Sequence, residues 1–243
     1  MSDVILQIIE QGAKELNIEL PPAVGAAFEA YADFLSLHGR HTNLTAISDA
    51  EEIARLHFLD SLALLCIGGE GETLFDNATV IDIGSGAGFP GIPLKLALPT
   101  ISLTVLDAAR KKTDFLSELC ARLKISATCV HARAEIASHD LSMRDSFDIC
   151  VSRAVAKLNI LCELCLPFVQ VGGLFVAMKS VRSDGEIEAA QNAINLLGGE
   201  LYKIFDYLIP GTDITHRAVL VRKKTATPDG YPRKFAKLRK APL

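Results

Sequence analysis

The sequence predicts an α/β fold in which a mostly parallel, doubly wound sheet carries an antiparallel edge hairpin and a helical N-terminal extension. Three observations predict it: helix-spaced apolar residues before residue 75, alternating β-rich and helical segments from Thr79 onward, and two final strand-like runs with no helix between them. Alternation of this kind is typical of parallel sheets that are covered on both faces. We expect a helical cap over 1–75, a sheet domain over 76–224 and a basic tail over 225–243.

The N-terminal part contains three predicted helices. Apolar residues recur every three to four positions over 4–16, and Pro21 and Pro22 then break the chain and start a second helix that carries an apolar face to Leu35. A polar loop follows, and a third helix is expected from about Ala50 to Ile67. The Gly-rich stretch GGEGE then separates this helical part from the sheet domain.

The sheet domain is predicted from the order of its segments. Short apolar, β-branched runs favour strands, whereas the longer amphipathic segments between them favour helices. The expected strands are TVIDIG (79–84), SLTVLDA (102–108), ISATCVHA (125–132), FDICVSRA (147–154), GGLFVAMK (172–179), LYKIFDYLIP (201–210) and HRAVLVRKK (216–224). The expected helices are 91–99, 111–124, 158–169 and 186–198.

The composition excludes several classes of protein. Of 243 residues, 49% are hydrophobic and 22% charged, and no apolar run approaches the roughly 18 residues that span a bilayer, so we expect neither a disordered nor a membrane protein. The first residues carry acids and no signal-peptide cleavage site, which indicates a cytoplasmic location. The six cysteines are scattered among apolar residues, and Cys162-x-x-Cys165 has no second ligand pair, so we expect thiols and no metal.

Charge is distributed unevenly along the chain. After Leu220 there are eight basic residues against one acid, so this end carries +7 while the rest of the chain carries −11. An acidic body with a basic end favours a polyanionic partner such as a nucleic acid. A merely solvated terminal tail is the alternative.

The most informative stretch is a glycine-rich turn, Val80-Ile-Asp-Ile-Gly-Ser-Gly-Ala-Gly-Phe-Pro-Gly91. Glycines let a ligand approach the backbone, and the helix that follows offers free N–H groups. Gly86, Gly88 and Gly91 also satisfy the dinucleotide fingerprint G-x-G-x-x-G, so an NAD-dependent oxidoreductase stays open. A purely structural turn stays open as well.

Acidic residues near the turn favour a different ligand. Asp82 lies inside the strand, where its carboxylate would orient an ammonium group, and Asp107 ends the next strand, where it would accept hydrogen bonds from both hydroxyls of a ribose. The pattern D-x-G-x-G-x-G with a strand-terminal Asp resembles the class I S-adenosylmethionine-dependent methyltransferases.

Two further positions follow the third and fourth strands. Ala134 and Glu135 would frame the edge of an adenine. Arg153 would hold a phosphate or polarise a purine at the mouth of the site, and a structural ion pair is the alternative for this residue. The motifs with which methyltransferases act on exocyclic nitrogens or on cytosine C5 are absent, and Cys150 is expected to fill the core.

Taken together, these stretches resemble the ribosomal RNA small subunit methyltransferase G family, over nearly the whole chain. The matching stretches are Asn43-Leu-Thr-Ala-Ile47, His57-Phe-Leu-Asp-Ser61, Asp82–Pro93, Arg133-Ala-Glu135, Ser152-Arg-Ala-Val-Ala156 and Tyr231-Pro-Arg-Lys234. The chain departs from the family at Phe235-Ala-Lys-Leu-Arg-Lys240, which is bulkier and more basic than the usual continuation.

The resemblance implies transfer of a methyl group from S-adenosylmethionine to N7 of a guanine in 16S rRNA. It implies a cofactor site at Gly84, Phe89, Ala134, Glu135 and Arg153, with Asp107 on the ribose. From the residues themselves we add Asp82 and Gly86 to this site, and Arg153 and Asn43 as candidates for positioning the substrate. No catalytic base is expected, because guanine N7 loses no proton on methylation.

The resemblance further implies a partner, the 16S rRNA or the small ribosomal subunit, and we expect a monomer. Two alternatives stay open at this point: the NAD-dependent oxidoreductase, and a ribosome-assembly module that binds RNA without catalysis. The first would need a proton donor for hydride transfer, and the sequence offers no convincing one.

Overall fold

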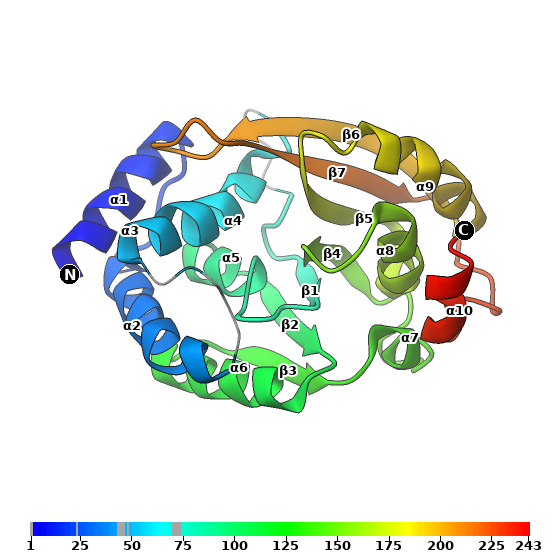
Figure 1. Cartoon of the computed structure of the whole chain (residues 1–243), viewed down its shortest axis with the longest axis horizontal. Helices are drawn as coiled ribbons and strands as arrows, with labels where there is room; N and C mark the ends of the chain where they lie inside the picture. Colours follow the sequence, from blue (N-terminus) through cyan, green and yellow to red (C-terminus); the bar gives the residue numbers. More distant parts are fainter. Residues whose placement is uncertain (1, 23, 43–46, 48, 70–73) are drawn as a thin grey trace.

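A seven-stranded sheet runs through the centre of the structure (Figure 1). The computed structural model describes residues 2–22, 24–42, 47, 49–69 and 74–243. The strand order is β3-β2-β1-β4-β5-β7-β6. Strand β7 is antiparallel to both of its neighbours and all other pairs are parallel, which confirms the predicted, mostly parallel sheet with an antiparallel edge hairpin. The strands are β1 (Thr79–Ile83), β2 (Ser102–Asp107), β3 (Ala127–His131), β4 (Phe147–Arg153), β5 (Val169–Ser180), β6 (Gly199–Leu208) and β7 (Thr215–Lys223).

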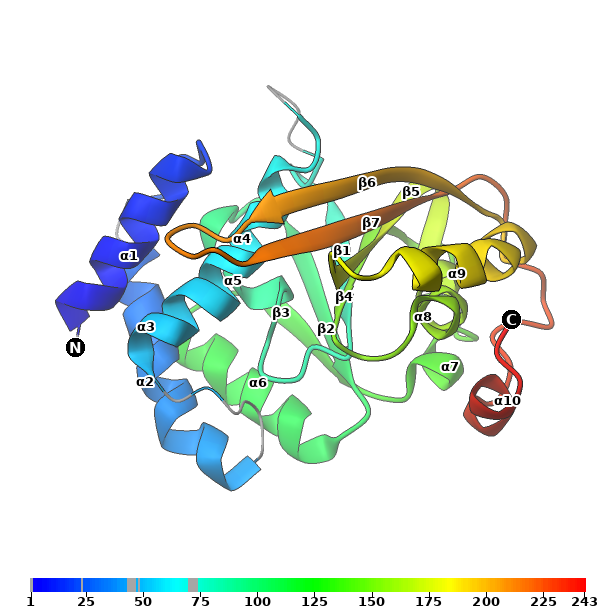
Figure 2. The same cartoon turned by 45° about the horizontal axis from the view of Figure 1, so that its top comes forward.

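Helices cover both faces of this sheet. One face packs against α5 and α6 together with the N-terminal helices, and the other packs against α7 to α10 (Figures 1 and 2). The α-helices are α1 (Ser2–Glu15), α2 (Val24–Thr42), α3 (Ala50–Ile53), α4 (Asp60–Leu62), α5 (Gly91–Ala97), α6 (Arg110–Leu123), α7 (Ala134–Ala137), α8 (Leu158–Cys165), α9 (Asp184–Leu196) and α10 (Phe235–Lys240).

The predicted helix over 50–67 is formed by helical turns of changing pitch. A π-helical segment, η1 (Ala54–Leu59), joins α3 to α4, and a 3₁₀ turn, η2 (Ala63–Cys66), ends the stretch. Widened π-helical turns are found frequently at functional sites. This one carries His57 on the side of the molecule where the strands β1 and β4 end.

The central strands are apolar on both faces because helices cover them above and below. In β1, Val80 and Ile81 are both fully buried, yet they belong to two different hydrophobic clusters. Buried parallel strands are near-continuous apolar runs for this reason. Asp82 is the exception in β1, since its carboxyl group is buried on the face that packs against α5.

The N-terminal helices share one hydrophobic cluster with the sheet. Phe28 and Tyr31 of α2 pack against Phe58, and the Tyr31 ring stacks on Phe89 with 5.3 Å between the ring centroids. The Tyr31 hydroxyl donates a hydrogen bond of 2.6 Å to the carbonyl of Ala87 in the glycine-rich turn. The helical part thus supports the turn directly, while its predicted border at residue 75 stays a prediction.

The C-terminal end, expected as a basic tail over 225–243, is docked onto the sheet domain, which argues against the alternative of a merely solvated tail. Leu238 of α10 is fully buried beside α8, and Figure 2 shows α10 against the side of the molecule that carries α7 and α8. The Arg233 guanidinium pairs with both oxygens of Glu163, at 2.8 and 2.6 Å, and this carboxylate is fully buried. Apolar burial and a satisfied ion pair therefore hold the end of the chain.

Removing the Tyr31 hydroxyl tests its support of the turn. We expect Tyr31→Phe to lower the free energy of unfolding by about 1–3 kcal/mol, because the buried Ala87 carbonyl loses its donor. Urea unfolding measures this change. The matched control is Tyr202→Phe, where the ring is 48% exposed and a change within about 0.5 kcal/mol is expected. Equal effects of the two substitutions would contradict the account.

Candidate functional site

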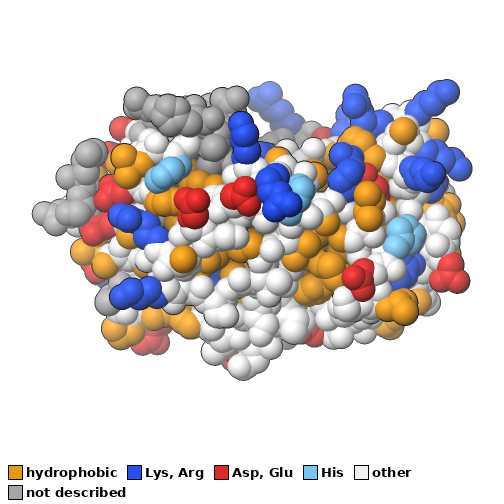
Figure 3. Space-filling model, turned by 90° about the horizontal axis from the view of Figure 1, so that it is seen from below, with side chains coloured by type: hydrophobic (Ala, Val, Ile, Leu, Met, Phe, Trp, Pro, Cys, Tyr) orange, Lys and Arg blue, Asp and Glu red, His pale blue; other side chains and the backbone are white. Residues whose placement is uncertain are grey.

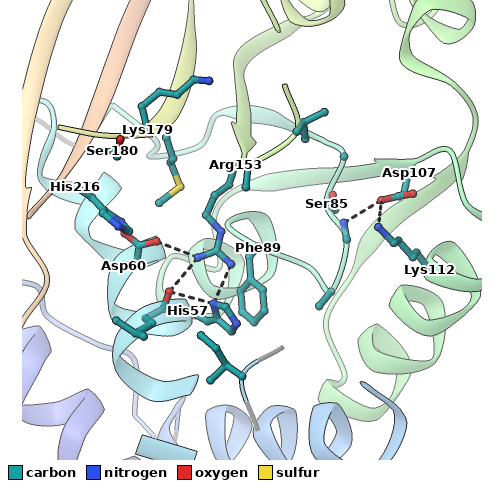
Figure 4. Close-up of a pocket in the computed structure, with 18 of the residues that line it drawn as sticks. His57, Asp60, Ser85, Phe89, Asp107, Lys112, Arg153, Lys179, Ser180 and His216 are labelled. Atoms are coloured by element: carbon teal, nitrogen blue, oxygen red, sulfur yellow. Dashed lines mark hydrogen bonds and ion pairs between the residues drawn. The ribbon is translucent and has the colours of Figure 1, made fainter. Parts of the chain in front are cut away.

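The main cavity, of about 930 Å³, opens where β1, β2, β4 and β5 end. Doubly wound folds bind their ligands at this edge of the sheet. Figure 4 shows that the side chains around it come from the π-helical turn, the glycine-rich turn, the strand ends and β7. The residues that line it include His57, Asp60, Gly84, Ser85, Gly86, Ala87, Phe89, Asp107, Lys112, Arg153, Val155, Met178, Lys179, Ser180, Ile214 and His216.

The glycine-rich turn forms one wall of the cavity. Gly84 has a φ of +74°, and its N–H bonds the carbonyl of Leu106 in the neighbouring strand at 2.8 Å. A Cβ at this position would lie 2.5 Å from the Val155 side chain, so a larger residue would be both strained and crowded. Glycine here keeps the backbone accessible between Leu106 and Val155.

Asp107 stands at the end of β2 beside this turn. Its carboxylate accepts hydrogen bonds from the N–H groups of Gly86 at 3.1 Å and of Ala109 at 2.9 Å. Lys112 lies 3.8 Å away. Each carboxylate oxygen can accept a second hydrogen bond. The side chain is therefore fixed in position and still able to receive donors from a ligand in the cavity.

Asp82 lies beneath the turn and is fully buried. Its Oδ2 accepts the N–H of Gly91 at 2.9 Å, whereas no described group bonds its buried Oδ1. Burial raises the pKa of Asp82 to about 7, even though the Gly91 N–H opposes this shift. Asp82 does not line the cavity, so its expected direct contact with an ammonium group stays a prediction.

Ala134 and Glu135 start the short helix α7 and are buried, but neither lines the main cavity. Glu135 forms an ion pair with Arg133, whose guanidinium lies over the Phe235 ring at 4.4 Å. The structure thus brings together Gly84, Gly86, Phe89, Asp107 and Arg153 in one cavity and leaves the pair Ala134 and Glu135 beside it. Asn43 falls outside the described residues.

Arg153 crosses the middle of the cavity (Figure 4). Its guanidinium lies 4.8 Å from the centre of the Phe89 ring and donates to the Leu56 carbonyl at 3.2 Å and to Asp60 at 3.0 Å. It also approaches Nδ1 of His57 at 3.1 Å. Burial, together with the charge of Arg153, lowers the pKa of His57 to about 4, so this imidazole is neutral at pH 7.

Sequence reasoning missed the group that holds Arg153. Asp60 is fully buried, and besides Arg153 its carboxylate accepts the Tyr207 hydroxyl at 2.9 Å and Nδ1–H of His216 at 2.8 Å. We refer to these four residues as the Asp60 cluster. Two signals were available, because Asp60 is the only acid in the apolar run from Phe58 to Leu65 and also lies in the matching stretch His57-Phe-Leu-Asp-Ser61. Tyr207 and His216 gave no such signal, since they reach Asp60 only in the folded chain.

Only part of the basic end is available to a polyanion, contrary to the expectation for the whole segment. Lys223 is fully buried, where its ammonium group bonds Asp145, Thr227 and two carbonyls, and Arg233 is held by Glu163. Figure 3 shows Lys and Arg side chains gathered mainly on the upper and right parts of one face. Four basic residues on and before α10 are exposed: Lys234, Lys237, Arg239 and Lys240.

The sequence predicts neither a bound metal nor a membrane-spanning segment. Among the described residues, no group of three or more His, Cys, Asp or Glu side chains could hold a metal ion. In the same part of the chain, none of the helices combines the length and apolar character that a membrane crossing requires.

Comparison with known proteins places the chain in a family. The profile of the rRNA small subunit methyltransferase G family (GidB) matches residues 25–210. The chain belongs to this family. Relatives named Ribosomal RNA small subunit methyltransferase G, from Alkaliphilus oremlandii and Acetivibrio thermocellus, are 44% and 41% identical to it. The alignments cover 97% and 98% of this chain and 98% and 96% of those relatives.

Solved structures resemble the chain in fold. A mutant of MtNAS matches with a TM-score of 0.55 and 12% identity over 90% of this chain and 86% of that one. A methyltransferase from Pyrococcus furiosus matches with a TM-score of 0.52 and 11% identity over 69% and 83% of the two chains. With the strand order and the family match, the predicted class I methyltransferase fold is confirmed. The two alternatives, an oxidoreductase and a non-catalytic module, find no support in these comparisons.

The buried carboxyl group of Asp82 makes stability depend on pH. Its folded pKa of about 7 lies above the usual value of 3.8, so its favourable contribution is complete below about pH 4 and is lost as the pH rises through 7. Relative to Asp82→Asn, whose amide oxygen can still accept the Gly91 N–H, the wild type should lose on the order of 1 kcal/mol per pH unit in this window. Urea unfolding at several pH values measures the difference, and a difference that stays constant with pH would contradict the account.

Proposed function

We propose that this chain transfers a methyl group from S-adenosylmethionine to N7 of a guanine in 16S rRNA. The observation that carries the proposal is full-length similarity to proteins named Ribosomal RNA small subunit methyltransferase G, combined with an open cavity on the glycine-rich turn. Neither alone would suffice, because the fold is shared by many functions.

The cavity fits this cofactor in volume and in chemistry. Ligand pockets usually measure about 300–1,000 Å³, and this one is about 930 Å³. Gly84 and Gly86 would bring the backbone close to the cofactor, Phe89 would supply an apolar surface, and Asp107 has lone pairs free for ribose hydroxyls. We assign Ala134 and Glu135 to the adenine edge, with Asp82 supporting the turn from below.

Methyl transfer to guanine N7 requires no catalytic acid or base from the protein. The bound cofactor supplies a methyl group on a positively charged sulfur, and guanine N7 supplies a lone pair without losing a proton. The side chains therefore orient the two reactants and exclude water, which can contribute about 7–11 kcal/mol in favourable cases. Arg153 is suited to positioning because its charge is already balanced by Asp60.

RNA would approach the basic residues of α10 and the open side of the cavity. Exposed Lys and Arg side chains bind phosphates without reading sequence, and an unstacked base can enter a cavity. Lys223 and Arg233 are excluded from this role because their partners are internal. The monomeric state and the cytoplasmic location predicted from the sequence stay predictions.

The test is transfer of labelled methyl from S-adenosylmethionine to bare 16S rRNA and to assembled small subunits, followed by mapping of the modified atom. We expect one guanine to carry the label at N7. Gly84→Ala should reduce the affinity for S-adenosylmethionine by roughly tenfold or more, since it strains a positive φ and crowds Val155.

The matched control for this test is Gly185→Ala in α9, where an added Cβ meets no neighbouring atom within 4 Å. It should leave transfer unchanged. Absence of label in both forms of the RNA would overturn the proposal. Label on another atom or on another base would overturn the assignment to guanine N7.

A further inference from the structure

The side chain of His216 lines the cavity and has no role in the proposed function described above. It lies near the start of β7, paired in register with Ser180 of β5 and Tyr207 of β6. Its side chain is 35% exposed and lines the cavity. The Tyr207 ring meets it edge-on, with 6.3 Å between the centroids. The imidazole is thus held between two strands and faces open space.

The bond with Asp60 decides which nitrogen faces the cavity. Burial alone would raise the pKa of Asp60, but the hydrogen bond from His216 and the charge of Arg153 bring this pKa below its usual value, so the group is a carboxylate at neutral pH. A carboxylate can only accept hydrogen bonds, and therefore Nδ1 of His216 carries the hydrogen. In its neutral form the ring presents the lone pair of Nε2, which no described residue bonds.

The two sides of the cavity are lined by different side chains. Figure 4 places Ser85, Asp107 and Lys112 on one side and Lys179, Ser180 and His216 on the other, with Phe89 and Arg153 between them. The first side carries the groups assigned to the cofactor. The volume of the whole cavity, about 930 Å³, lies near the upper end of the range for a single small ligand. The second side therefore has room for the base that receives the methyl group.

We propose that His216, in its neutral form, contacts the acceptor guanine, with Nε2 accepting a hydrogen bond from an N–H of its Watson–Crick edge. This inference rests on the proposed function and names a specificity residue for it. Guanine carries a donor at N1, where adenine carries an acceptor, so an accepting nitrogen favours guanine.

The charge balance of the Asp60 cluster agrees with this role. The positive charge of Arg153 and the negative charge of Asp60 cancel, and His57 is neutral. In its neutral form His216 adds no positive charge beside a base that itself becomes positive when N7 is methylated. Asp60 acts here as a positioning residue, because it fixes the imidazole without touching the base.

Two substitutions separate the two nitrogens of His216. Asn places an amide N–H where Nδ1 stands and can keep the bond to Asp60, but it has nothing in the place of Nε2. Gln reaches the place of Nε2 with a polar amide and gives up the Nδ1 position. A structural role for His216 is therefore preserved by Asn, whereas a role in contacting the base is preserved by Gln.

The experiment measures methyl transfer to 16S rRNA and affinity for S-adenosylmethionine in His216→Asn, His216→Gln and the wild type. We expect Asn to lower kcat/KM for RNA by roughly tenfold, chiefly through KM, and Gln to stay within about threefold of the wild type. The affinity for S-adenosylmethionine should stay within about twofold in both variants. Full activity of the Asn variant, or an equal loss of cofactor affinity in both, would overturn the inference.

A spectroscopic readout in the wild type needs no variant. The ¹⁵N resonance of His216 Nε2 should shift when RNA is added to the cofactor-bound protein, while Nδ1 keeps the shift of a protonated nitrogen. An unchanged Nε2 resonance under saturating RNA would overturn the inference. Wild-type protein that transfers no methyl to RNA would instead refute the proposed function, so the two failures are distinguishable.

Discussion

The structure of this site depends on one buried carboxylate, that of Asp60. A charge removed from water is tolerated only when partners compensate it, and here Arg153, Tyr207 and His216 each supply a hydrogen bond. The four members of the Asp60 cluster come from α4, β4, β6 and β7. The carboxylate can therefore be satisfied only when the N-terminal helices, a central strand and the edge hairpin are all in place.

This constraint explains why the helical cap and the sheet build one cavity. Arg153 is anchored on the cap through Asp60 and the Leu56 carbonyl, and it lies over the ring of Phe89. Tyr31 supports the glycine-rich turn from the same side. The cofactor side of the cavity thus depends on α2, and the side assigned to the acceptor base depends on the strand that carries His216.

The sequence was informative where function depends on local pattern. Alternating segments predicted the sheet, two consecutive strand-like runs predicted its edge hairpin, and the turn at Gly84 with Asp107 located the cavity. It was uninformative where contacts join distant segments, because Asp60 and His216 are 156 positions apart and nothing in the sequence indicates that they pair. The positive charge counted after Leu220 also misled, because Lys223 and Arg233 are basic residues that form ion pairs within the fold.

A double-mutant cycle on Asp60 and Arg153 tests the central role of this carboxylate most directly. Unfolding free energies would be measured by urea denaturation for Asp60→Asn, Arg153→Met and the double variant. Each single change should cost about 3–5 kcal/mol by leaving a charge without its partner, and the double variant should cost much less than their sum. Additive costs would show that the two residues act independently and would contradict the account.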